Sequence, residues 1–306
     1  MRFLPIFLGL SALVSARCGT QPPSENLKAH HKYFQDKEDR DASSRLATRD
    51  VFNVTIDTYV HVILTNTTHV NRTALPAQIH SQIEVLNENY EGTGFSFNLL
   101  NITYTPNNNW QQINQESQTE WEVKSTLRRG DYTTLNIYYG GLGNDLLGYA
   151  TFPDNVSPRD FLLDGVVNSI TTLPGGAPPF DLGITAVHEI GHWLNLLHTF
   201  QPSGNDPDLP GCFGPGDYIH DTPAEAVASY GCPRLRDTCA GTNETTNQWS
   251  LPGVDPIHNF MDYSDDDCLS NFTPGQVIRM QNSWVEGRVA YVPGVAGRRA
   301  RRGSGW

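Results

Sequence analysis

Residues 188–198 read HEIGHWLNLLH, and this stretch restricts the fold more than any other part of the chain. Side chains four residues apart lie one above the other on a helix, so His188 and His192 point the same way. Two imidazoles on one rigid turn can fill two corners of a tetrahedral zinc site. Glu189 then lies beside the metal without binding it, where it can take a proton from the bound water. The stretch predicts a zinc-binding helix that begins near Thr185.

His198 lies six residues beyond His192, and a straight helix would turn its side chain away from the metal. It can return as a third ligand only if the helix ends and the chain bends sharply near residue 195. Such a bend needs a positive φ, which glycine adopts freely and asparagine more readily than the remaining residue types. Asn195 stands where motifs of this kind normally have glycine, at a cost of about 1 kcal/mol. We therefore expect an intact zinc site with three histidine ligands.

The N-terminal residues have the features of an export signal. Residues 1–16 read MRFLPIFLGLSALVSA, which combines one arginine, a short apolar run and small residues at the end, so we expect a signal peptide cut after Ala16. No other apolar stretch of the sequence is long enough to span a membrane. We expect the mature protein to be secreted, extracellular, free of membrane contact and monomeric.

Charge and glycosylation motifs agree with export. The formal net charge of −12 disfavours binding to nucleic acid and to anionic membranes. The basic end, residues 297–306, is an exception that we interpret as a solvated tail. Seven sequons mark candidate N-glycosylation sites: Asn53, Asn66, Asn71, Asn101, Asn155, Asn243 and Asn271.

The chain has five cysteines, an odd number for an exported protein. Four lie in the last third of the chain: Cys212, Cys232, Cys239 and Cys268. These four should form two disulfides in an oxidising compartment. Cys18 stands alone near the N-terminus, so a free thiol, an intermolecular bridge and a functional thiol all stay open for it.

A polar segment separates the expected signal from the rest of the chain. Residues 17–50 are charge-rich with little apolar periodicity, and we interpret them as a pro-segment or N-terminal linker. The catalytic domain then spans residues 51–306, in which apolar spacing predicts strands and helices. The expected strands are 51–66, 95–105, 134–139, 148–154 and 164–169, and the expected helices besides the zinc helix are 75–92, 116–130 and 273–285.

Two of these helices carry specific expectations. In the second, Trp121 and Leu127 should face inward; the last should begin with a capping box at Thr273. Residues 201–256 are rich in Pro, Gly, Asp and Cys, so we expect loops held together by disulfides. The chain therefore reads as a mixed α/β layer followed by an irregular half.

The zinc motif, together with NFMDYSDDDC at residues 259–268, resembles the metzincin metalloproteases, and specifically the pappalysin family with its secreted fungal members. Further segments carry the resemblance over most of the chain: CGTQPPSE, LNIYY, LLGYATFPD, DGVVNS, LPGG and GDYIHDTPAE. The resemblance implies an α+β metzincin fold. Its upper subdomain is a twisted, mostly parallel mixed sheet with helices, and its lower subdomain is irregular and disulfide-stapled, with a C-terminal helix.

The resemblance also implies roles for individual residues. The three histidines bind Zn²⁺, and Glu189 acts as general base and general acid. Met261 forms a turn beneath the metal. Tyr263 is a phenol near the metal that helps to stabilise the transition state, with a purely structural tyrosine as the alternative. An extended peptide should dock along the strand GYATFPD, at an edge of the sheet.

Three further features follow from the resemblance. Cys18 matches the inhibitory cysteine of pappalysin-type zymogens, whose thiolate would take the fourth zinc position and displace the water. Asp217 and Thr222 match a calcium-binding loop, so Ca²⁺ is a second expected cofactor, with a solvated acidic loop as the alternative. The implied disulfides are Cys212–Cys239 and Cys232–Cys268.

A run of carboxylates after Met261 suggests a specificity pocket. In metzincins this segment helps to wall the pocket for the residue on the carboxyl side of the cut. A carboxylate at the pocket floor would pair with arginine or lysine, and we expect Asp266 to be that group. Calcium binding or simple hydration of these aspartates is the alternative.

We therefore expect a secreted zinc-dependent endopeptidase. It should hydrolyse peptide bonds of extracellular proteins through a zinc-bound water and Glu189. Two other classes fit part of the sequence. A zinc-stabilised binding protein would have no need of Glu189. A different zinc enzyme could use a downstream ligand such as Glu225, but the spacing of His198 and the methionine turn oppose this.

Overall fold

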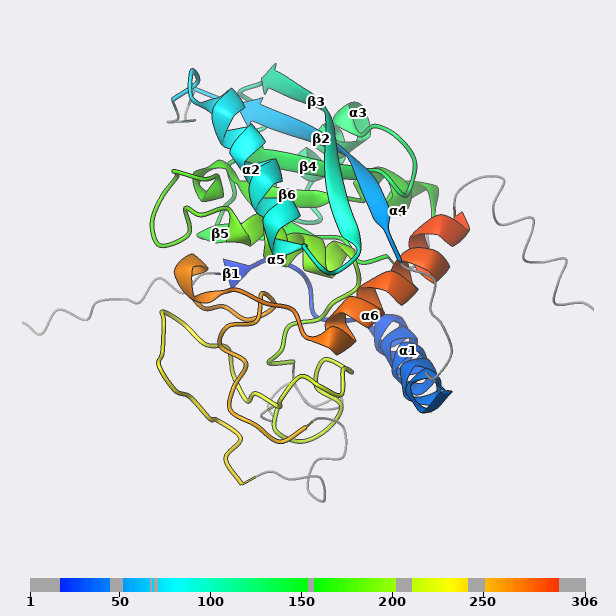
Figure 1. Ribbon diagram of the computed structural model, residues 1–306. Helices are drawn as coiled ribbons and strands as arrows, with labels where there is room; N and C mark the ends of the chain where they lie inside the picture. Colours follow the sequence, from blue (N-terminus) through cyan, green and yellow to red (C-terminus); the bar gives the residue numbers. More distant parts are fainter. Residues whose placement is uncertain are drawn as a thin grey trace, which may run out of the picture.

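The computed structural model describes residues 17–44, 52–66, 68, 71–153, 157–201, 211–241 and 251–291. Its architecture is α+β: a twisted sheet with helices forms the upper part in Figure 1, and loops form most of the lower part. None of the helices in these ranges has the length and apolar character needed to cross a membrane. The expected signal peptide and the basic tail lie outside the described residues.

One sheet contains six strands: β1 (Arg17–Cys18), β2 (Val54–Leu64), β3 (Phe95–Pro106), β4 (Leu135–Gly140), β5 (Leu146–Ala150) and β6 (Val166–Ser169). Their order is β1-β5-β6-β4-β2-β3. Strand β5 runs antiparallel to β6, and every other neighbouring pair is parallel. The central strand β4 is buried along its whole length, which explains its nearly continuous apolar sequence.

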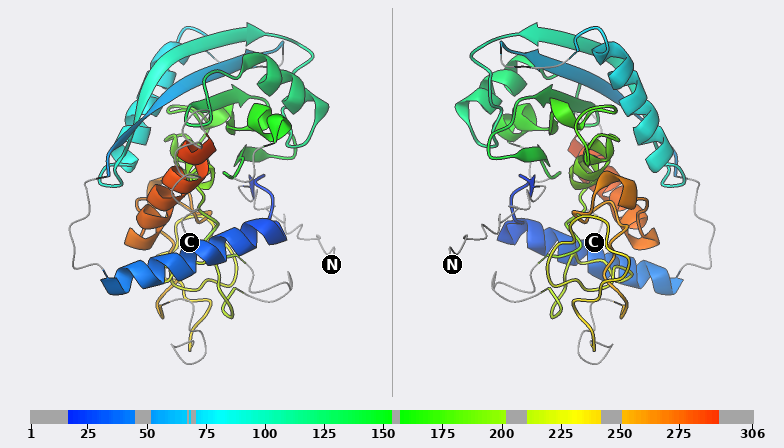
Figure 2. Two further views of the ribbon diagram at one scale, coloured as in Figure 1. Left: turned by 90° about the vertical axis from the view of Figure 1, so that its right-hand side faces the viewer. Right: turned by 90° about the vertical axis from the view of Figure 1, so that its left-hand side faces the viewer.

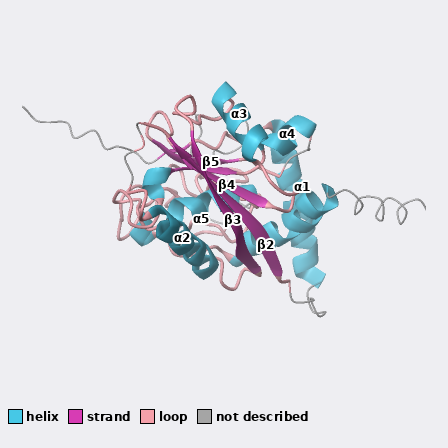
Figure 3. Cartoon of the chain, turned by 90° about the horizontal axis from the view of Figure 1, so that it is seen from above, coloured by secondary structure: helices cyan, strands magenta, loops and turns pink. Residues whose placement is uncertain are grey.

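Helices cover both faces of the sheet (Figure 3). Helices α2 (Leu75–Asn89) and α5 (Ile184–Trp193) lie on one side, and α3 (Gln118–Leu127) and α4 (Pro158–Leu163) lie on the other. The larger hydrophobic core lies on the α2–α5 side and continues beneath α5 into the lower part. As a result α5 is buried along its whole length, between the sheet and the loops.

Helix α3 differs from its expected orientation. Leu127 faces inward as expected, but Trp121 is only half-buried and stacks against Arg159, whose guanidinium carbon lies 4.9 Å from the ring centroid. Glu120 and Lys124 face inward instead, as a buried ion pair at 2.7 Å. Opposite charges one helical turn apart can be buried together because each compensates the other.

The segment interpreted as a pro-segment or linker contains a long helix, α1 (Glu25–Ser44). Leu27, His31, Phe34 and Gln35 are buried along one side of it. These positions have helical spacing, but two of the four are polar, so the sequence shows little apolar periodicity. The apolar spacing of the sequence therefore did not predict this helix within the segment.

Beyond His198 the described chain is mostly loop, as the sequence predicts. The last helix, α6 (Pro274–Ser283), begins with the expected capping box at Thr273 and continues into the π-helical turn Trp284–Arg288. The loops are held by two disulfides, in the pairing that the resemblance implies: Cys212–Cys239 and Cys232–Cys268.

Asp164, between α4 and β6, accepts hydrogen bonds from several elements. Its side chain is 2% exposed. The carboxylate accepts hydrogen bonds from Arg128 and from the indole of Trp193, both at 3.1 Å, and from Arg288 at 3.2 Å. These donors come from the end of α3, from α5 and from the turn after α6. One buried carboxylate between two guanidinium groups therefore connects both faces of the sheet with the C-terminal helix.

Candidate metal centre

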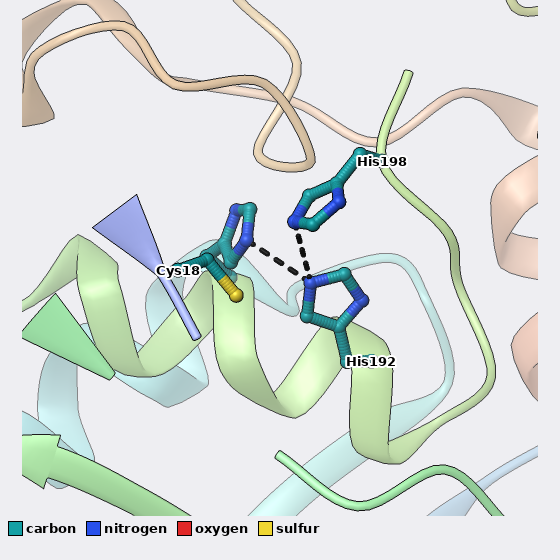
Figure 4. Close-up of side chains that lie close together, drawn as sticks. Cys18, His192 and His198 are labelled. Atoms are coloured by element: carbon teal, nitrogen blue, oxygen red, sulfur yellow. Dashed lines mark hydrogen bonds between the residues drawn. The ribbon is translucent and has the colours of Figure 1, made fainter. Parts of the chain in front are cut away.

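Three imidazoles converge at α5 and the loop that follows it (Figure 4). The Nε2 atom of His192 lies 3.1 Å from Nε2 of His188 and 3.0 Å from Nε2 of His198. His188 and His192 are one turn apart on α5, whereas His198 reaches the same point from the loop. The three histidines of the motif therefore meet at one buried point.

Asn195 makes the expected bend after α5. Its φ is +78°, in the left-handed region. The Leu196 amide closes the last turn on the Gly191 carbonyl, 2.9 Å away. The expectation of a positive φ is confirmed, and this conformation is what returns His198 to the other two rings. The side chain adds a contact that the sequence did not indicate: Nδ2 donates to Oγ of Ser283 on α6 at 2.7 Å.

Asn195→Val is expected to lower the free energy of unfolding by about 2–4 kcal/mol and to weaken zinc binding. A β-branched residue resists positive φ, and valine cannot donate to Ser283. Asn195→Gly is the matched control: it relieves about 1 kcal/mol of strain and loses about 1 kcal/mol of hydrogen bonding, so it should be nearly neutral. Denaturant unfolding and zinc titration measure both effects. A valine variant with wild-type stability and metal content would refute the bend argument.

Hydrogen bonds from the other ring nitrogens orient two of the imidazoles. His188 Nδ1 donates to the Phe260 carbonyl and His192 Nδ1 to the Leu196 carbonyl, both at 2.7 Å. Both Nε2 atoms therefore present lone pairs to the centre. Burial lowers the pKa of His188 to about 4, so this ring is neutral at pH 7. Burial and the neighbouring histidines also lower the pKa values of His192 and His198.

The donor set fits a zinc ion. Nitrogen ligands about 2.0–2.1 Å from a tetrahedral zinc lie about 3.3–3.4 Å apart. The observed Nε2 separations of 3.0 and 3.1 Å are close to this value. Cys18 adds a sulfur, since its Sγ and the ring nitrogens of the three histidines all lie within 4.8 Å of one another. Imidazole and thiolate are common zinc ligands, so the residues present suit this metal, with Cys18 as a fourth donor.

Glu189 lies beside the three rings and is 1% exposed. Its Oε2 accepts a hydrogen bond from Thr20 Oγ1 at 3.1 Å. Gly148 on β5 leaves room for the carboxylate, because a Cβ there would lie 2.8 Å from Glu189 Cγ. Burial raises the pKa of Glu189 to about 8, although hydrogen bonds with Cys18 and Thr20 act in the opposite direction. A carboxyl group that can exchange a proton near neutral pH therefore lies next to the histidine cluster.

The turn that contains Met261 packs against α5 on the side of the two helical histidines. Met261 is fully buried, and its sulfur lies against Gly191, where any Cβ would collide with it. The Tyr263 hydroxyl lies 3.2 Å from Nε2 of His198 and donates to the Cys18 carbonyl at 3.4 Å. The structure therefore places Met261 beneath α5 and the Tyr263 phenol at the histidine cluster.

The outer edge of β5 carries an extended peptide, and that peptide is the start of the described chain itself. Cys18 pairs with Gly148 in the parallel β1–β5 ladder. Thr20 accepts a hydrogen bond from the Ala150 amide at 3.0 Å and donates to Glu189. No local signal in the sequence marks Thr20, because its partner is 169 residues away.

A pocket opens beside the histidine cluster, and Asp266 is part of its lining together with Phe180, Glu189 and Leu269. Asp266 is 3% exposed, and its Oδ2 accepts a hydrogen bond from the Leu182 amide at 2.9 Å. Burial raises the pKa of Asp266 to about 6. The carboxylate therefore lies in the region where the sequence leads us to expect a specificity pocket.

Asp217 and Thr222, the candidate calcium ligands, are both buried. Asp217 Oδ1 accepts a hydrogen bond from the Ile219 amide at 3.0 Å. Asp217 Oδ2 and Thr222 Oγ1 have no hydrogen-bond partner within the described ranges. Burial raises the pKa of Asp217 to about 8. Buried oxygen atoms without partners suit a hard cation, so calcium in this loop stays a prediction.

The candidate glycosylation sites are exposed wherever the structure describes them. Two of them, Asn155 and Asn243, lie outside the described residues. A glycan needs an exposed asparagine in the folded protein, so occupancy of the others stays a prediction. The exposed acceptors are Asn53, Asn66, Asn71, Asn101 and Asn271.

Fold and site together are those of a metalloprotease, and comparisons with known proteins agree. The sequence profile of the M43 peptidase family, described as pregnancy-associated plasma protein-A, matches residues 137–285. A protein of Pyricularia oryzae named extracellular metalloprotease is 42% identical over 275 residues, which cover 89% of each chain. A protein of the same name from Arthroderma benhamiae is 38% identical over 301 residues, covering 94% of this chain and 92% of that protein. The chain belongs to the pappalysin family of metalloproteases.

Solved structures extend the similarity to the fold. Mature mirolysin of Tannerella forsythia, in complex with a cleaved peptide, is 31% identical with a TM-score of 0.60. That match covers 78% of this chain and 96% of mirolysin. A promirolysin variant is 29% identical with a TM-score of 0.61, covering 88% of this chain and 95% of promirolysin. The chain is therefore a metal-dependent peptidase of metzincin fold, whose substrates are proteins or peptides.

Proposed function

We propose that this metalloprotease is a secreted, zinc-dependent endopeptidase made as a latent precursor. The observation that carries the proposal is the meeting of three Nε2 atoms at 3.0 and 3.1 Å, with Glu189 on the same helix. His188, His192 and His198 would hold the zinc. The relatives named extracellular metalloproteases support secretion. The test is hydrolysis of a generic protein such as casein, which a chelator should abolish and added zinc should restore.

The chain's own groups have defined tasks in peptide hydrolysis. Zinc, when bound, would supply Lewis-acid polarisation of the scissile carbonyl and of a water molecule. Glu189 takes a proton from the attacking water and later gives it to the leaving amine. Tyr263 donates a hydrogen bond to the oxyanion that develops. Met261 supports α5 from below and keeps the two helical histidines in place.

Latency would come from residues 17–20, because they contact the groups that we propose as catalytic. Cys18 lies at the histidine cluster, its carbonyl accepts the Tyr263 hydroxyl, and Thr20 bonds Glu189. The promirolysin match covers more of this chain than the mature mirolysin match, 88% against 78%, which supports a pro-segment. We therefore propose a signal peptide at 1–16, a pro-segment at 17–50 and a catalytic domain at 51–306, acting as a monomer.

Cys18→Ala is expected to give a precursor that hydrolyses peptides without being cut. The thiol is lost, although β1 and Thr20 still lie in the site, so the activity should be lower than that of the processed enzyme. A fluorogenic peptide assay on the uncut chain measures it. The double variant Cys18→Ala/Glu189→Gln is the control and should stay inactive. An inert Cys18→Ala precursor that works only after cleavage would mean that the segment inhibits by blocking the site alone.

Asp266 is proposed to select a basic residue after the cut. Peptides with arginine at that position should be cleaved about 10–100-fold faster than matched peptides with leucine, because a buried carboxylate pairs with guanidinium. Asp266→Ala should remove most of this preference, and Asp267→Ala, at an exposed neighbour, should not. Values of kcat/KM for the matched peptides measure the effect. No preference in the wild type, or a preference that Asp266→Ala leaves unchanged, would refute the assignment.

A further inference from the structure

Helix α1 contacts the body of the protein at α6, and none of its described side chains belongs to the histidine cluster. It lies beside α6 in the lower part of the molecule, whereas β1 lies under β5 (Figures 1 and 2). Phe34 and His31 on α1 are completely buried. The segment 17–44 therefore contacts the protein both at the metal centre, through residues 17–20, and at α6, through α1.

The second place is centred on Arg279 of α6, which is completely buried. Its Nε and Nη2 atoms donate to the two carboxylate oxygens of Glu38, at 3.1 and 3.0 Å. Asn282, almost one turn further along α6, donates to the same carboxylate at 3.1 Å. A bidentate, charge-assisted pair of this kind is both strong and specific in its geometry.

The remaining partners of Arg279 do not carry negative charge. Nη1 lies 2.8 Å from Nδ1 of His31, and Nη2 donates to the Tyr218 carbonyl at 2.6 Å. Burial and Arg279 hold the pKa of His31 well below its usual value, so this ring is neutral and accepts the hydrogen bond. Within the described ranges, the ion pair of Arg279 is with Glu38. The ion-pair partner of this buried arginine therefore comes from residues 17–44, and the carboxyl of Asp217 is a further acidic group close enough to interact with it.

A second ion pair lies at the rim of the same contact. Lys37 Nζ lies 2.6 Å from Glu286, and the Tyr33 hydroxyl donates to the same carboxylate at 3.2 Å. Both groups of the ion pair are about one quarter exposed, 24% and 26%, so this pair contributes less than the buried one. The contact therefore has a buried centre, formed by the Arg279–Glu38 pair beside Phe34, and a partly exposed charged rim, as docking interfaces do.

We propose that Arg279 and Asn282 of α6, with Glu286 in the turn that follows, form a docking surface for α1. Residues 17–44 would then act as a two-point inhibitor that stays bound after the chain is cut between 45 and 50. This inference rests on the proposed function, because it assumes that residues 17–50 are a pro-segment. The α1 contact involves neither the metal nor the bond that is cut. While α1 is docked, Cys18 is held at a high effective concentration beside the histidines. Activation therefore requires release of α1 as well as the cut.

The first test measures the accessibility of Cys18 in the full chain. Cys18 is the one cysteine outside the two disulfides, so its alkylation by iodoacetamide can be followed by mass. Glu38→Gln should increase the alkylation rate about 10-fold or more, because it removes the charge that compensates Arg279. Asp39→Asn is the matched control: it makes the same charge change at the exposed neighbour and should leave the rate unchanged. Equal rates in both variants and the wild type would overturn the proposal.

The second test follows the segment after cleavage. A recognition sequence for a specific protease is placed within residues 45–50, the chain is cut, and the products are separated by gel filtration. The fragment with α1 should co-elute with the catalytic domain in the wild type and in Asp39→Asn, and should separate in Glu38→Gln. Immediate separation in the wild type would overturn the proposal.

Two further measurements separate loss of docking from misfolding and from loss of metal. Lys37→Ala leaves Arg279 paired and should raise the alkylation rate only about 2–3-fold, so it replaces Glu38→Gln if that variant does not fold. The alkylation is repeated after removal of metal with a chelator, where the difference between Glu38→Gln and the wild type should persist. Neither readout uses peptidase activity. If the cut protein is inactive but retains the fragment with α1, only the proposed function is contradicted. If it is active but loses that fragment at once, only the docking inference is contradicted.

Discussion

Glu189→Gln is expected to reduce peptide hydrolysis by about 10²–10⁴-fold in the processed enzyme while leaving zinc content and fold unchanged. Glutamine has nearly the same shape and can still accept the hydrogen bond that Glu189 receives from Thr20 in the precursor. It cannot accept a proton from the attacking water, so only the proton transfer is lost. The kcat values of both proteins, cut by the same external protease, measure the effect.

Zinc content and the melting temperature are the controls for this variant. Glu189 lies beside the three histidines, but its Oε2 accepts from Thr20 and no ligand atom of the cluster belongs to it. Both controls should therefore match the wild type. A Glu189→Gln enzyme with wild-type kcat would refute the general-base role while leaving the metal site intact.

Asp164→Ala is expected to lower the free energy of unfolding by about 3–5 kcal/mol. Asp164 is 2% exposed and lies between the guanidinium groups of Arg128 and Arg288, at 3.1 and 3.2 Å. Alanine leaves both buried charges without compensation and also leaves the Trp193 indole without its acceptor. Denaturant unfolding of the full chain measures the loss.

Two further variants are controls for Asp164→Ala. Asp164→Asn keeps the shape and one carbonyl acceptor, so its cost should be smaller, about 1–3 kcal/mol. Glu84→Ala removes an exposed carboxylate from α2 and should cost less than about 0.5 kcal/mol. An Asp164→Ala protein within about 1 kcal/mol of the wild type would mean that the two arginines find other partners or water.

The zinc helix and its bend were predictable because their causes are local. Four-residue spacing aligns His188 with His192, and the return of His198 requires a positive φ, which Asn195 has. The strands were predictable for a similar reason, since β-branched and aromatic runs mark them. The capping box at Thr273 is also a local pattern, and it begins α6 as expected.

Sequence patterns were least informative where burial depends on distant partners. Helix α1 buries His31 and Gln35, which no periodicity of apolar residues could indicate. Its anchor, Glu38, meets Arg279 across 241 residues of chain. In α3, Lys124 is buried because Glu120 compensates its charge, and Trp121, which we expected to face inward, is only half-buried. Polar groups that are buried in pairs are therefore the part of this fold that sequence patterns conceal.

The zinc content of the wild type and of His198→Ala, measured by elemental analysis after dialysis against a weak chelator, tests the central claim most directly. His198 is the proposed ligand that would distinguish a three-histidine site from a chance pair on a helix, and its Nε2 lies 3.0 Å from that of His192. We predict one zinc per chain in the wild type and about one tenth of that or less in the variant, with an unchanged circular dichroism spectrum. A His198→Ala chain that keeps one zinc, or a folded wild type that binds none, would contradict the account.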